Sequence, residues 1–529
     1  MACKLAIDFG TCNTRVAIWD EARHEARPLF VPDVSLMAKS RDSTGNLVEA
    51  PYIPSLISYT NKHVWIGKQV RDQGLAEAGC TFRWMKRYLA NRLEIPRRVE
   101  GRFIKMSEAG ADFLVRVIVY AAETVELGDE EVAFTIPVEA FEHYQDWISR
   151  VCQTVGITRY RFLDEASAAA LGYGLTLRGD AAYMVFDFGG GTLDVSVVRV
   201  DPGARGTRRC TVLGKSGVDV GGTTIDQWLY RDVLELNHVA PEDVRHLSGL
   251  LLLEVERVKE ALSSVERDEI VVADPRTGEV LTAAYSRSRF DDILEQNGLF
   301  ETIETTVHRA LADARERGYD REHIEAVLLI GGSSLIPSVR RAVRQMFGPR
   351  VKTHQPLDAV VRGAAAFVAG IDFADHIQHE YALRYYNREK GEHEYFTLVP
   401  AGTPYPSHGP IAQVLVKASY DDQEFLGLEI YEIGKKDGLL RGEGPILDLV
   451  FDPSGAVRFR KREDANVLSK FWINEKFPTF IHAQPKAKRS ERRFPVQFSI
   501  DGRKYLCVTV RDTLTGKTLM ENHPVIKLI

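Results

Sequence analysis

A glycine run flanked by acidic residues lies near the middle of the chain, within residues 185–198. Residues 189–191 are all glycine, so their backbone N–H groups can approach phosphate without interference from a Cβ atom. Thr192 adds a hydroxyl, and Asp187 and Asp194 add carboxylates of the kind that hold hydrated Mg²⁺. Apolar, β-branched residues on both sides predict two strands joined by this turn. Taken alone, the motif is equally typical of an ordinary hairpin turn with two exposed acids.

A second segment near the start of the chain has the same pattern. Residues 5–18 contain an apolar strand, then Asp8-Phe9-Gly10, small hydroxyl residues and another apolar strand. Two related phosphate turns in one chain predict a duplicated core that binds nucleotide between its halves.

The two turns resemble the phosphate segments of the actin, sugar-kinase and heat-shock ATPase superfamily. Residues 163–174, which read LDEASAAALGYG, are similar more narrowly to the DnaK-like, seventy-kilodalton heat-shock chaperones. The resemblance covers about residues 2–370 and implies an α/β fold, a two-lobed actin-like ATPase domain of duplicated sheets with flanking helices.

The resemblance also implies a set of residues that serve hydrolysis. Taken by itself, Lys86 would be a solvated surface lysine, but it matches the family's catalytic lysine, which neutralises charge on the transferred phosphoryl group. Glu165 matches a carboxylate near Mg²⁺ and the attacking water, although it also suits the start of the alanine-rich helix that follows. The expected catalytic residues are Lys86, Glu165, Asp187, Thr192 and Thr11.

Three later segments resemble the family's remaining nucleotide contacts: the glycine turn at 221–222, a predicted helix over 250–264 and the strand and Gly-Gly turn at 326–337. Glu256, Lys259 and Ser263 share one face of that helix, which is otherwise an ordinary charged surface. The expected nucleotide-binding residues are Gly10, Thr11, Cys12, Asn13, Gly189, Gly190, Gly191, Thr192, Gly221, Gly222, Glu256, Lys259, Ser263, Gly331, Gly332, Ser333 and Asp358. The expected metal ligands are Asp8, Asp187 and Asp194, and the implied cofactors are ATP or ADP and Mg²⁺, with K⁺ as a further candidate.

Several positions depart from the family pattern. Cys12 replaces a threonine, so Thr11 should carry more of the phosphate contact because a thiol is a weak donor. Gln145 stands where an arginine relays the nucleotide state, and a neutral amide cannot replace a guanidinium. Leu335 and Glu260 stand where basic residues contact adenine, which predicts weaker adenine binding. The family's leucine-rich linker is not found after the ATPase domain.

The composition sets the broad class. The chain has 529 residues, enough for two or more domains, and a net charge of -6 that gives no general attraction to nucleic acid or anionic lipid. The cysteines are scattered and show neither a CxxC motif nor the spacing of a zinc site. We therefore expect a protein of a reducing compartment without a metal cluster. With Met1 running directly into the first strand and no long apolar run, we expect a cytoplasmic protein that does not enter membranes. The cysteines are Cys3, Cys12, Cys80, Cys152, Cys210 and Cys507.

The residue pattern changes toward the end of the chain. We expect the ATPase domain over 1–372, a linker over 373–394 and, over 395–529, short alternating strands that predict a β-sandwich. Its start at 399–406 faintly resembles the family's peptide-binding domain, with residues 452–455 or 501–502 as the late hairpin, and the helical lid of the family is expected to be absent.

A basic stretch with interleaved aromatic residues lies within this last domain, at 458–493. Such a mixture can bind nucleic acid or an acidic partner, but a solvated loop with a buried aromatic core is the favoured interpretation. We expect no nucleic-acid partner.

The favoured function is an ATP-hydrolysing chaperone that binds unfolded or partner polypeptide through the β-domain, by strand addition or in an apolar cleft, with co-chaperones as further partners. A nucleotide-gated adaptor with one dedicated partner and little hydrolysis is the alternative, favoured by Gln145, Leu335 and the missing linker and lid. A sugar kinase fits poorly, because it explains neither the Glu165 segment nor the β-rich end.

Overall fold

The computed structural model divides the chain into two compact units. The first comprises Met1–Val138, Tyr144–Ala374 and Gly438–Asp464, and the second comprises Glu139–His143, Asp375–Asp437 and Ala465–Ile529. The structure describes residues 4–41, 47–125, 131–137, 142–174, 181–202, 208–353, 357–370, 373–374, 377, 379–387, 390–434, 447–461, 469–475, 478–501 and 504–528.

The first half of the first unit is built on one mixed sheet, in the order β12-β11-β1-β2-β5-β4 with β3 also paired to β2. Strand β1 runs parallel to β11 and antiparallel to β2, and β11 runs parallel to β12. The strands are β1 (Leu5–Asp8), β2 (Asn13–Asp20), β3 (Glu25–Pro28), β4 (Leu36–Arg41), β5 (Leu47–Pro54), β11 (Val132–Ile136) and β12 (Tyr160–Asp164).

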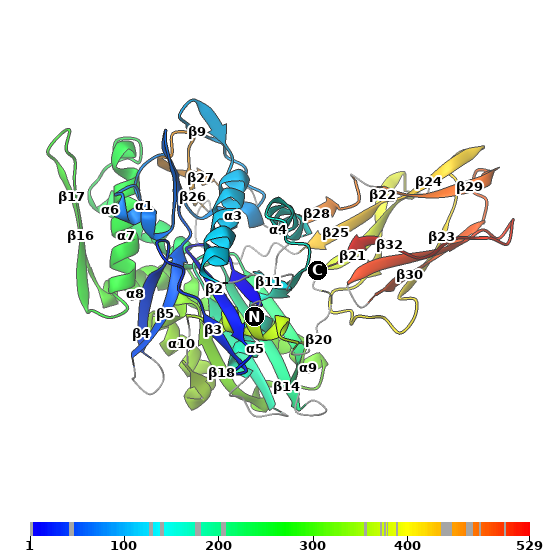
Figure 1. Ribbon diagram of the computed structural model, residues 1–529, viewed down its shortest axis with the longest axis horizontal. Helices are drawn as coiled ribbons and strands as arrows, with labels where there is room; N and C mark the ends of the chain where they lie inside the picture. Colours follow the sequence, from blue (N-terminus) through cyan, green and yellow to red (C-terminus); the bar gives the residue numbers. More distant parts are fainter. Residues whose placement is uncertain are drawn as a thin grey trace. The chain divides into compact units, whose positions relative to one another are not determined.

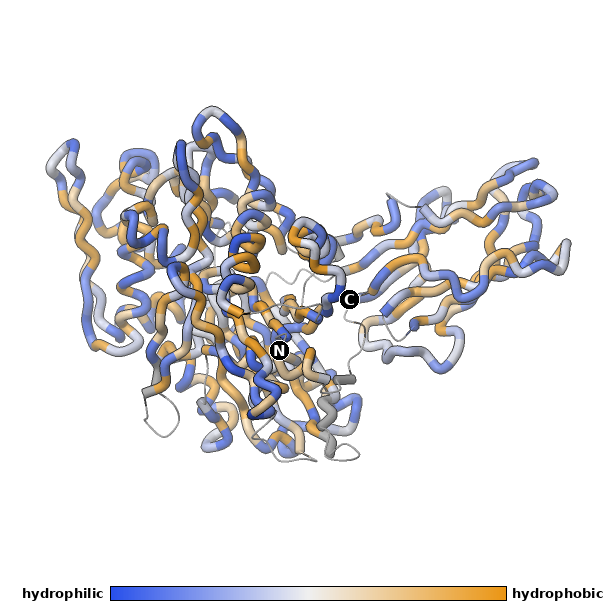
Figure 2. The backbone as a smooth tube through the Cα atoms, in the orientation of Figure 1, coloured by the Kyte–Doolittle hydropathy of each residue, from blue (hydrophilic) through white to orange (hydrophobic). Residues whose placement is uncertain are grey.

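The second half repeats this connectivity in the order β19-β18-β13-β14-β15-β20. Strand β13 is parallel to β18 and antiparallel to β14, just as β1 is parallel to β11 and antiparallel to β2. The predicted duplicated sheets are therefore confirmed, and Figure 2 shows hydrophobic residues along their central strands. The strands are β13 (Ala181–Phe188), β14 (Leu193–Pro202), β15 (Arg208–Val218), β18 (Ile324–Ile330), β19 (Val351–Lys352) and β20 (Phe373–Ala374).

Two small-residue helices cross between the halves. Helix α5 (Glu165–Gly174) packs on β13, β14 and β15 of the second sheet, whereas α11 (Ala359–Val368) packs on β1, β2 and β11 of the first. The helices touch backbone to backbone at two glycines. A Cβ added to Gly363 would lie only 1.6 Å from the Ala168 carbonyl oxygen, and a Cβ added to Gly172 would lie 2.0 Å from the Ala359 carbonyl oxygen. The alanine-rich segments permit this contact because they carry no bulky side chain at the crossing.

The remaining elements of the first unit surround the two sheets (Figure 1). The predicted helix over 250–264 begins two residues earlier and ends at Ala261, where a turn over 262–264 leads into β16. The helices are α1 (Lys68–Asp72), α2 (Met85–Ala90), α3 (Met106–Thr124), α4 (Glu142–Thr154), α6 (Gly222–Leu236), α7 (Ser248–Ala261), α8 (Arg287–Gln296), α9 (Leu299–Glu316) and α10 (Pro337–Phe347), with 3₁₀ segments η2 (Arg245–Leu247), η3 (Arg321–His323), η4 (Gly332–Leu335) and η5 (Gly348–Arg350). The outer strands are β6 (Ile57–Tyr59), β7 (Val64–Ile66), β8 (Thr81–Phe82), β9 (Arg97–Val99), β10 (Arg102–Ile104), β16 (Arg267–Ala273) and β17 (Val280–Ser286).

The second unit confirms the predicted β-rich domain. Its larger sheets have the orders β22-β21-β25-β28 and β23-β30-β31-β32, and β24 pairs with β29 around a shared apolar core. Beyond residue 377, the described residues contain no helix. The strands are β21 (Glu380–Asn387), β22 (Glu392–Val399), β23 (Ala412–Val416), β24 (Gln423–Leu428), β25 (Ile430–Gly434), β28 (Ser469–Trp472), β29 (Thr479–Ala487), β30 (Phe494–Ile500), β31 (Tyr505–Arg511) and β32 (Thr518–Lys527).

Two expectations for this part of the chain differ from the structure. The segment 373–394, expected as a linker, contains β20, β21 and the start of β22, because its alternating apolar residues complete sheets of both units. The basic stretch, expected as a loop, contributes β28 and β29, and Trp472 stacks on Tyr431 at 6.4 Å between ring centroids.

A third difference concerns residues 452–455, expected as a hairpin of the C-terminal domain. They form the turn between β26 (Leu447–Phe451) and β27 (Val457–Lys461), but this hairpin belongs to the first unit, where β26 packs on α6 and β27 on α7 (Figure 1). Its buried apolar residues, Leu449, Val450 and Phe451, explain why it joins a packed core. In the described part of the chain, no helix has the length and apolarity needed to cross a membrane.

Candidate functional site

The two predicted phosphate turns face each other across the halves of the first unit. A Cβ added to Gly190 would lie 2.8 Å from the Cys12 sulfur, and one added to Gly191 would lie 2.5 Å from Thr11 Oγ1. Only glycine permits this approach, and it brings the turn after β1 against the turn after β13. Residues 178 positions apart in sequence thus line one site, as the duplicated pattern predicts.

Two segments of the second half converge on the glycine turn. The Gly189 carbonyl accepts hydrogen bonds from Ser333 Oγ at 2.8 Å and from the Gly222 N–H at 3.0 Å. The Gly190 carbonyl accepts one from the Thr223 N–H at 2.8 Å. The N-terminus of α6 and the 3₁₀ turn η4 are thereby fixed beside the turn, which places Gly221 and Gly331 in the same group of loops.

Helix α7 contributes charged groups to the same place. Lys259 Nζ donates to the Gly222 carbonyl at 3.2 Å and pairs with the fully buried Asp226 at 2.7 Å. Glu256, one turn earlier, pairs at 3.2 Å with Arg83 from the other half. Ser263 is half-buried in the turn after the helix, so it does not lie on the helical face that the sequence predicted.

Lys86 and Glu165 form a buried ion pair between α2 and the start of α5. Burial alone would lower the pKa of Lys86, but the Glu165 carboxylate, with Tyr144 and Asp8, outweighs burial and raises it. The lysine is therefore held as a cation at neutral pH, as neutralisation of phosphate charge requires.

The carboxylates between the turns repel one another. Asp8 accepts a hydrogen bond from Thr135 Oγ1 at 2.8 Å. Burial, and then the charges of Glu165, Asp194 and Asp8, raise the pKa of Asp187 well above its usual value. A cation would relieve this repulsion, so the donor set fits a divalent metal.

No group of three or more His, Cys, Asp and Glu side chains in the described ranges is arranged as a ready-made metal site. Mg²⁺ itself keeps several waters and is usually held by one or two carboxylates together with phosphates rather than in an all-protein cage.

The first turn is anchored to β5 and its thiol is protonated. The Gly10 carbonyl accepts from Ser55 Oγ at 2.8 Å, and Asn13 begins β2 opposite Pro54. Burial, and then the charge of Glu256, raise the pKa of the Cys12 thiol to about 12. Cys12 therefore meets the opposite turn as a neutral thiol.

Two cationic residues of the site were not predicted. Arg15 lies opposite Asp8 in the β1–β2 register, and burial lowers its pKa while Asp8 and Asp358 oppose that change. Counting outward from the turn at 10–12 would have revealed this pair. Arg83 pairs with Glu256 across the halves, and no sequence pattern indicates that contact.

The structure places the remaining expected residues as follows. Asp358, expected at the nucleotide, precedes α11 and pairs with Arg362 at 2.7 Å. Gln145 is buried in α4, Leu335 is half-buried at the end of η4, and Glu260 is exposed. A Cβ added to Gly332, next to the site, would meet no other atom within 4 Å.

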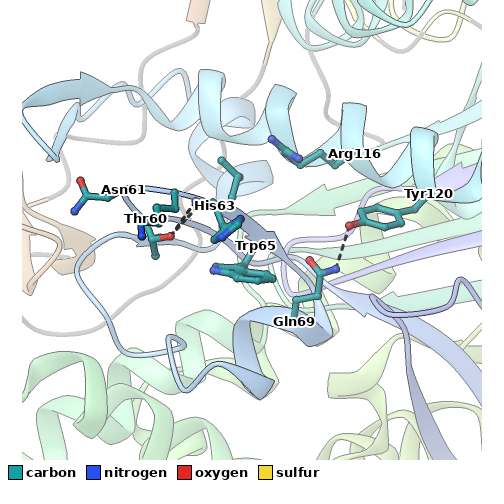
Figure 3. Close-up of a pocket in the computed structure, with 9 residues that line it drawn as sticks. Thr60, Asn61, His63, Trp65, Gln69, Arg116 and Tyr120 are labelled. Carbon is teal, nitrogen blue, oxygen red and sulfur yellow. Dashed lines mark hydrogen bonds between the residues drawn. The ribbon is translucent and has the colours of Figure 1, made fainter.

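A cavity of about 510 Å³ lies elsewhere on the first half, and none of the expected site residues lines it (Figure 3). Gln69 Nε2 donates to Tyr120 Oη at 3.1 Å beside it, and the His63 and Trp65 rings lie 5.2 Å apart. Its lining residues are Thr60, Asn61, Lys62, His63, Val64, Trp65, Gln69, Arg116 and Tyr120. This surface hollow is separate from the phosphate turns.

Comparison with known proteins gives a consistent result. The family model described as Hsp70 protein matches residues 94–383. A chaperone protein HscA homolog of Burkholderia thailandensis is 30% identical over 387 residues, which are 68% of this chain and 57% of the relative. A chaperone protein DnaK of Deinococcus deserti is 26% identical over 401 residues, which are 70% of this chain and 60% of the relative. The chain therefore spans about three fifths of the length of these curated relatives.

Proposed function

This chain belongs to the Hsp70 family, and on that premise we propose that it is an ATP-hydrolysing chaperone whose second unit binds unfolded or partner polypeptide. The observation that carries the proposal is the pair of glycine turns that meet at Cys12 and Gly190, with Lys86 and Glu165 paired near their acids. A site for a triphosphate needs both N–H-rich turns and a nearby cation, and the first unit supplies them.

We assign roles to the chain's own residues on this basis. The turns at 10–13 and 189–192 bind the phosphates, Lys86 balances charge on the transferred group, and Glu165 orients the attacking water. Asp8, Asp187 and Asp194 hold Mg²⁺, which when bound neutralises phosphate charge, and K⁺ is a second candidate for the same acids. Glu256 and Lys259 of α7 face the nucleoside, Ser263 approaches it from the turn after this helix, and Gly331–Ser333 and Gly221–Gly222 form its backbone surroundings.

The departures from the family pattern shape the expected affinity. Leu335 and Glu260 offer adenine no cation, so selectivity for adenine nucleotides should be weaker than in a typical member. Gln145 and the absence of a leucine-rich linker motif after α11 favour weak coupling between nucleotide state and polypeptide binding.

The second unit offers an exposed aromatic group for a polypeptide client. Phe425 and Phe480 are about half exposed, their ring centroids lie 6.2 Å apart, and His482 stacks on Phe425 at 4.9 Å. Adjacent exposed aromatic side chains on β24 and β29 suit an extended apolar segment better than a folded surface. Co-chaperones that regulate this cycle and a cytoplasmic location complete the proposal.

The test measures nucleotide binding and hydrolysis separately. Titration calorimetry with ATP and Mg²⁺ should give one site, and Lys86→Ala should retain binding while hydrolysis falls on the order of 100-fold. Full binding without hydrolysis by the unaltered protein, even with an unfolded client, would support the adaptor function instead.

Client binding is tested with an unfolded fluorescent polypeptide. The double variant Phe425→Ala, Phe480→Ala should lose most of the affinity, whereas Leu514→Ala, an exposed apolar residue elsewhere in the unit, should not. Equal affinities for all three proteins would remove the aromatic group from the proposal.

A further inference from the structure

The β26–β27 hairpin, residues 447–461, is fastened to α2 in the first half of the first unit. Asp448 pairs with Arg87 at 3.0 Å, and the Phe451 N–H donates to Tyr88 Oη at 2.9 Å. The guanidinium of buried Arg97 also lies over the Phe451 ring, with the Arg97 Cζ atom 4.4 Å from the ring centroid. Hydrogen bonds, charge and an aromatic contact therefore hold one side of the hairpin.

The same hairpin is fastened to the second half. The Val457 N–H donates to Ser248 Oγ at 3.0 Å, at the start of α7. Arg245, just before α7, pairs with Asp452 and donates to Ser454 Oγ at 3.2 Å. Asp452 also accepts the N–H of Ser454 at 2.8 Å, so the turn that Arg245 holds is itself rigid.

The hairpin is seated as closely as a core element. A Cβ on Gly79 would lie 2.6 Å from the Ser454 carbonyl oxygen, and one on Gly455 would lie 2.4 Å from that of Gly79. The turn therefore lies directly on the loop before β8, and substitution of either glycine would displace it. The hairpin residues with under 5% exposure are Leu449, Val450, Phe451, Asp452 and Val457.

Both anchoring helices carry residues of the nucleotide site. Arg87, which holds Asp448, directly follows Lys86 on α2. Ser248, which holds Val457, is on α7 with Glu256 and Lys259. The hairpin thus joins the two helices that carry expected site residues from opposite halves.

We infer that the β26–β27 hairpin is an intramolecular strap that holds the two halves closed over the nucleotide and slows its release. This inference rests on the proposed nucleotide site. A nucleotide enclosed between two halves can leave only when they separate, and separation of α2 from α7 must break the contacts of the strap on one side. The strap would act together with the direct Arg83–Glu256 pair.

The experiment follows release of a fluorescent ADP analogue from the full chain by stopped flow, after mixing with excess ADP. Asp448→Asn loosens the strap from α2, and Arg245→Met loosens it from the α7 side. Each should speed release about fivefold, as loss of one charge-assisted contact predicts. Arg458→Met is the matched control, because Arg458 is an exposed residue of β27, and its release rate should equal that of the unaltered protein.

The outcomes separate this inference from the proposed function. If the unaltered protein does not bind the analogue, the proposed function is wrong, and the strap then has no role in nucleotide release. Normal binding with unchanged release from both variants would overturn the strap alone.

Hydrogen exchange of the nucleotide-free protein gives an independent readout. The Phe451 and Val457 amides donate to Tyr88 and Ser248 side chains, so they should exchange slowly, and faster in Tyr88→Phe and Ser248→Ala. Fast exchange at both amides in the unaltered protein would show that the strap is not seated, which overturns the inference whether or not nucleotide binds.

Discussion

Arg15 stands directly opposite Asp8 in the antiparallel register of β1 and β2. Neighbouring positions on one face of a hairpin place side chains about 5 Å apart at Cβ. The protein therefore builds a cation of its own beside an acid expected to hold metal. Asp187 and Asp358 add their charges to the field at Arg15, which makes it the internal counter-charge of the acidic cluster.

Arg15→Gln should increase the stabilisation that Mg²⁺ gives. Without the guanidinium, Asp8, Asp187 and Asp358 repel one another more, so the nucleotide-free variant should lose about 2 kcal/mol of unfolding free energy. Added Mg²⁺ should then raise its melting temperature more than that of the unaltered protein. Arg23→Gln, at an exposed position after β2, is the control. Equal Mg²⁺ effects in all three proteins would contradict the assigned role of Arg15.

Asp187→Asn should stabilise the nucleotide-free protein while weakening Mg²⁺-nucleotide binding. Because the folded-state pKa of Asp187 is raised, the folded protein binds the proton more tightly, and stability falls as pH rises above the unfolded-state value of about 3.9. The variant lacks this loss, so its advantage should be small near pH 4 and reach about 2 kcal/mol at neutral pH. Urea unfolding across this pH range measures it, and an advantage that shrinks with rising pH would refute the argument.

Cys12→Thr should tighten nucleotide binding about fivefold, because a hydroxyl donates to phosphate more strongly than a thiol. Cys12→Ser, which adds no methyl group, should show a similar gain. With its pKa raised to about 12 the thiol is protonated at neutral pH, so it should react slowly with iodoacetamide. Rapid alkylation or unchanged affinity would mean that the thiol does not face the phosphates.

Gly363→Ala should destabilise the first unit by about 3 kcal/mol or prevent its folding. Its Cβ would lie 1.6 Å from the Ala168 carbonyl oxygen, and backbone in a helix cannot yield cheaply. Gly409→Ala, where a Cβ meets open space, is the control. Thermal unfolding followed by circular dichroism compares them, and equal melting temperatures would refute close contact at the crossing.

Asp512→Asn should destabilise the second unit by about 3 kcal/mol, because it leaves a buried arginine without its partner. Arg493 and Asp512 are each 1% exposed and share two hydrogen bonds of 2.7 and 2.8 Å. The hydrogen bonds from Arg493 are the largest cause that lowers the pKa of Asp512 in the folded protein. The ionised carboxylate therefore stabilises the fold fully above about pH 4, the pKa of an unfolded aspartate, and this stabilisation is lost as the pH falls through the lower pKa of the folded state.

Urea unfolding measures this change, with Glu521→Gln, at an exposed position of β32, as the control. The Asp512→Asn effect should therefore fade in acid, whereas a pH-independent effect would point to packing rather than charge.

Local sequence patterns predicted the parts of the site that glycine and strand signals define. The turns at 10–13 and 189–192 are such parts, because each follows an apolar strand that ends in Asp-Phe-Gly, and the repetition of this pattern predicted that the two turns are related. Arg83 and its contact with Glu256 were not predictable, since 173 residues separate them and only the packed halves bring them together. The helix before Ser263 ends earlier than predicted, because apolar spacing continues into a turn.

The placement of residues 447–461 was missed for a different reason. Alternating apolar residues predict the two strands but not the surface on which the strands pack. The strands were found, and their membership of the first unit depends on specific partners such as Tyr88 and Ser248, which no periodicity reveals.

Helices α5 and α11 touch backbone to backbone at Gly172 and Gly363, and this crossing is the pivot between the two halves of the first unit. Because the two backbones touch there, the halves would tilt about that point, and the gap that opens would grow with distance from it. Figure 1 shows β26 and β27 far from α5, so the strap has a long lever arm, and a few hydrogen bonds there resist a tilt more effectively than the same bonds would near the crossing.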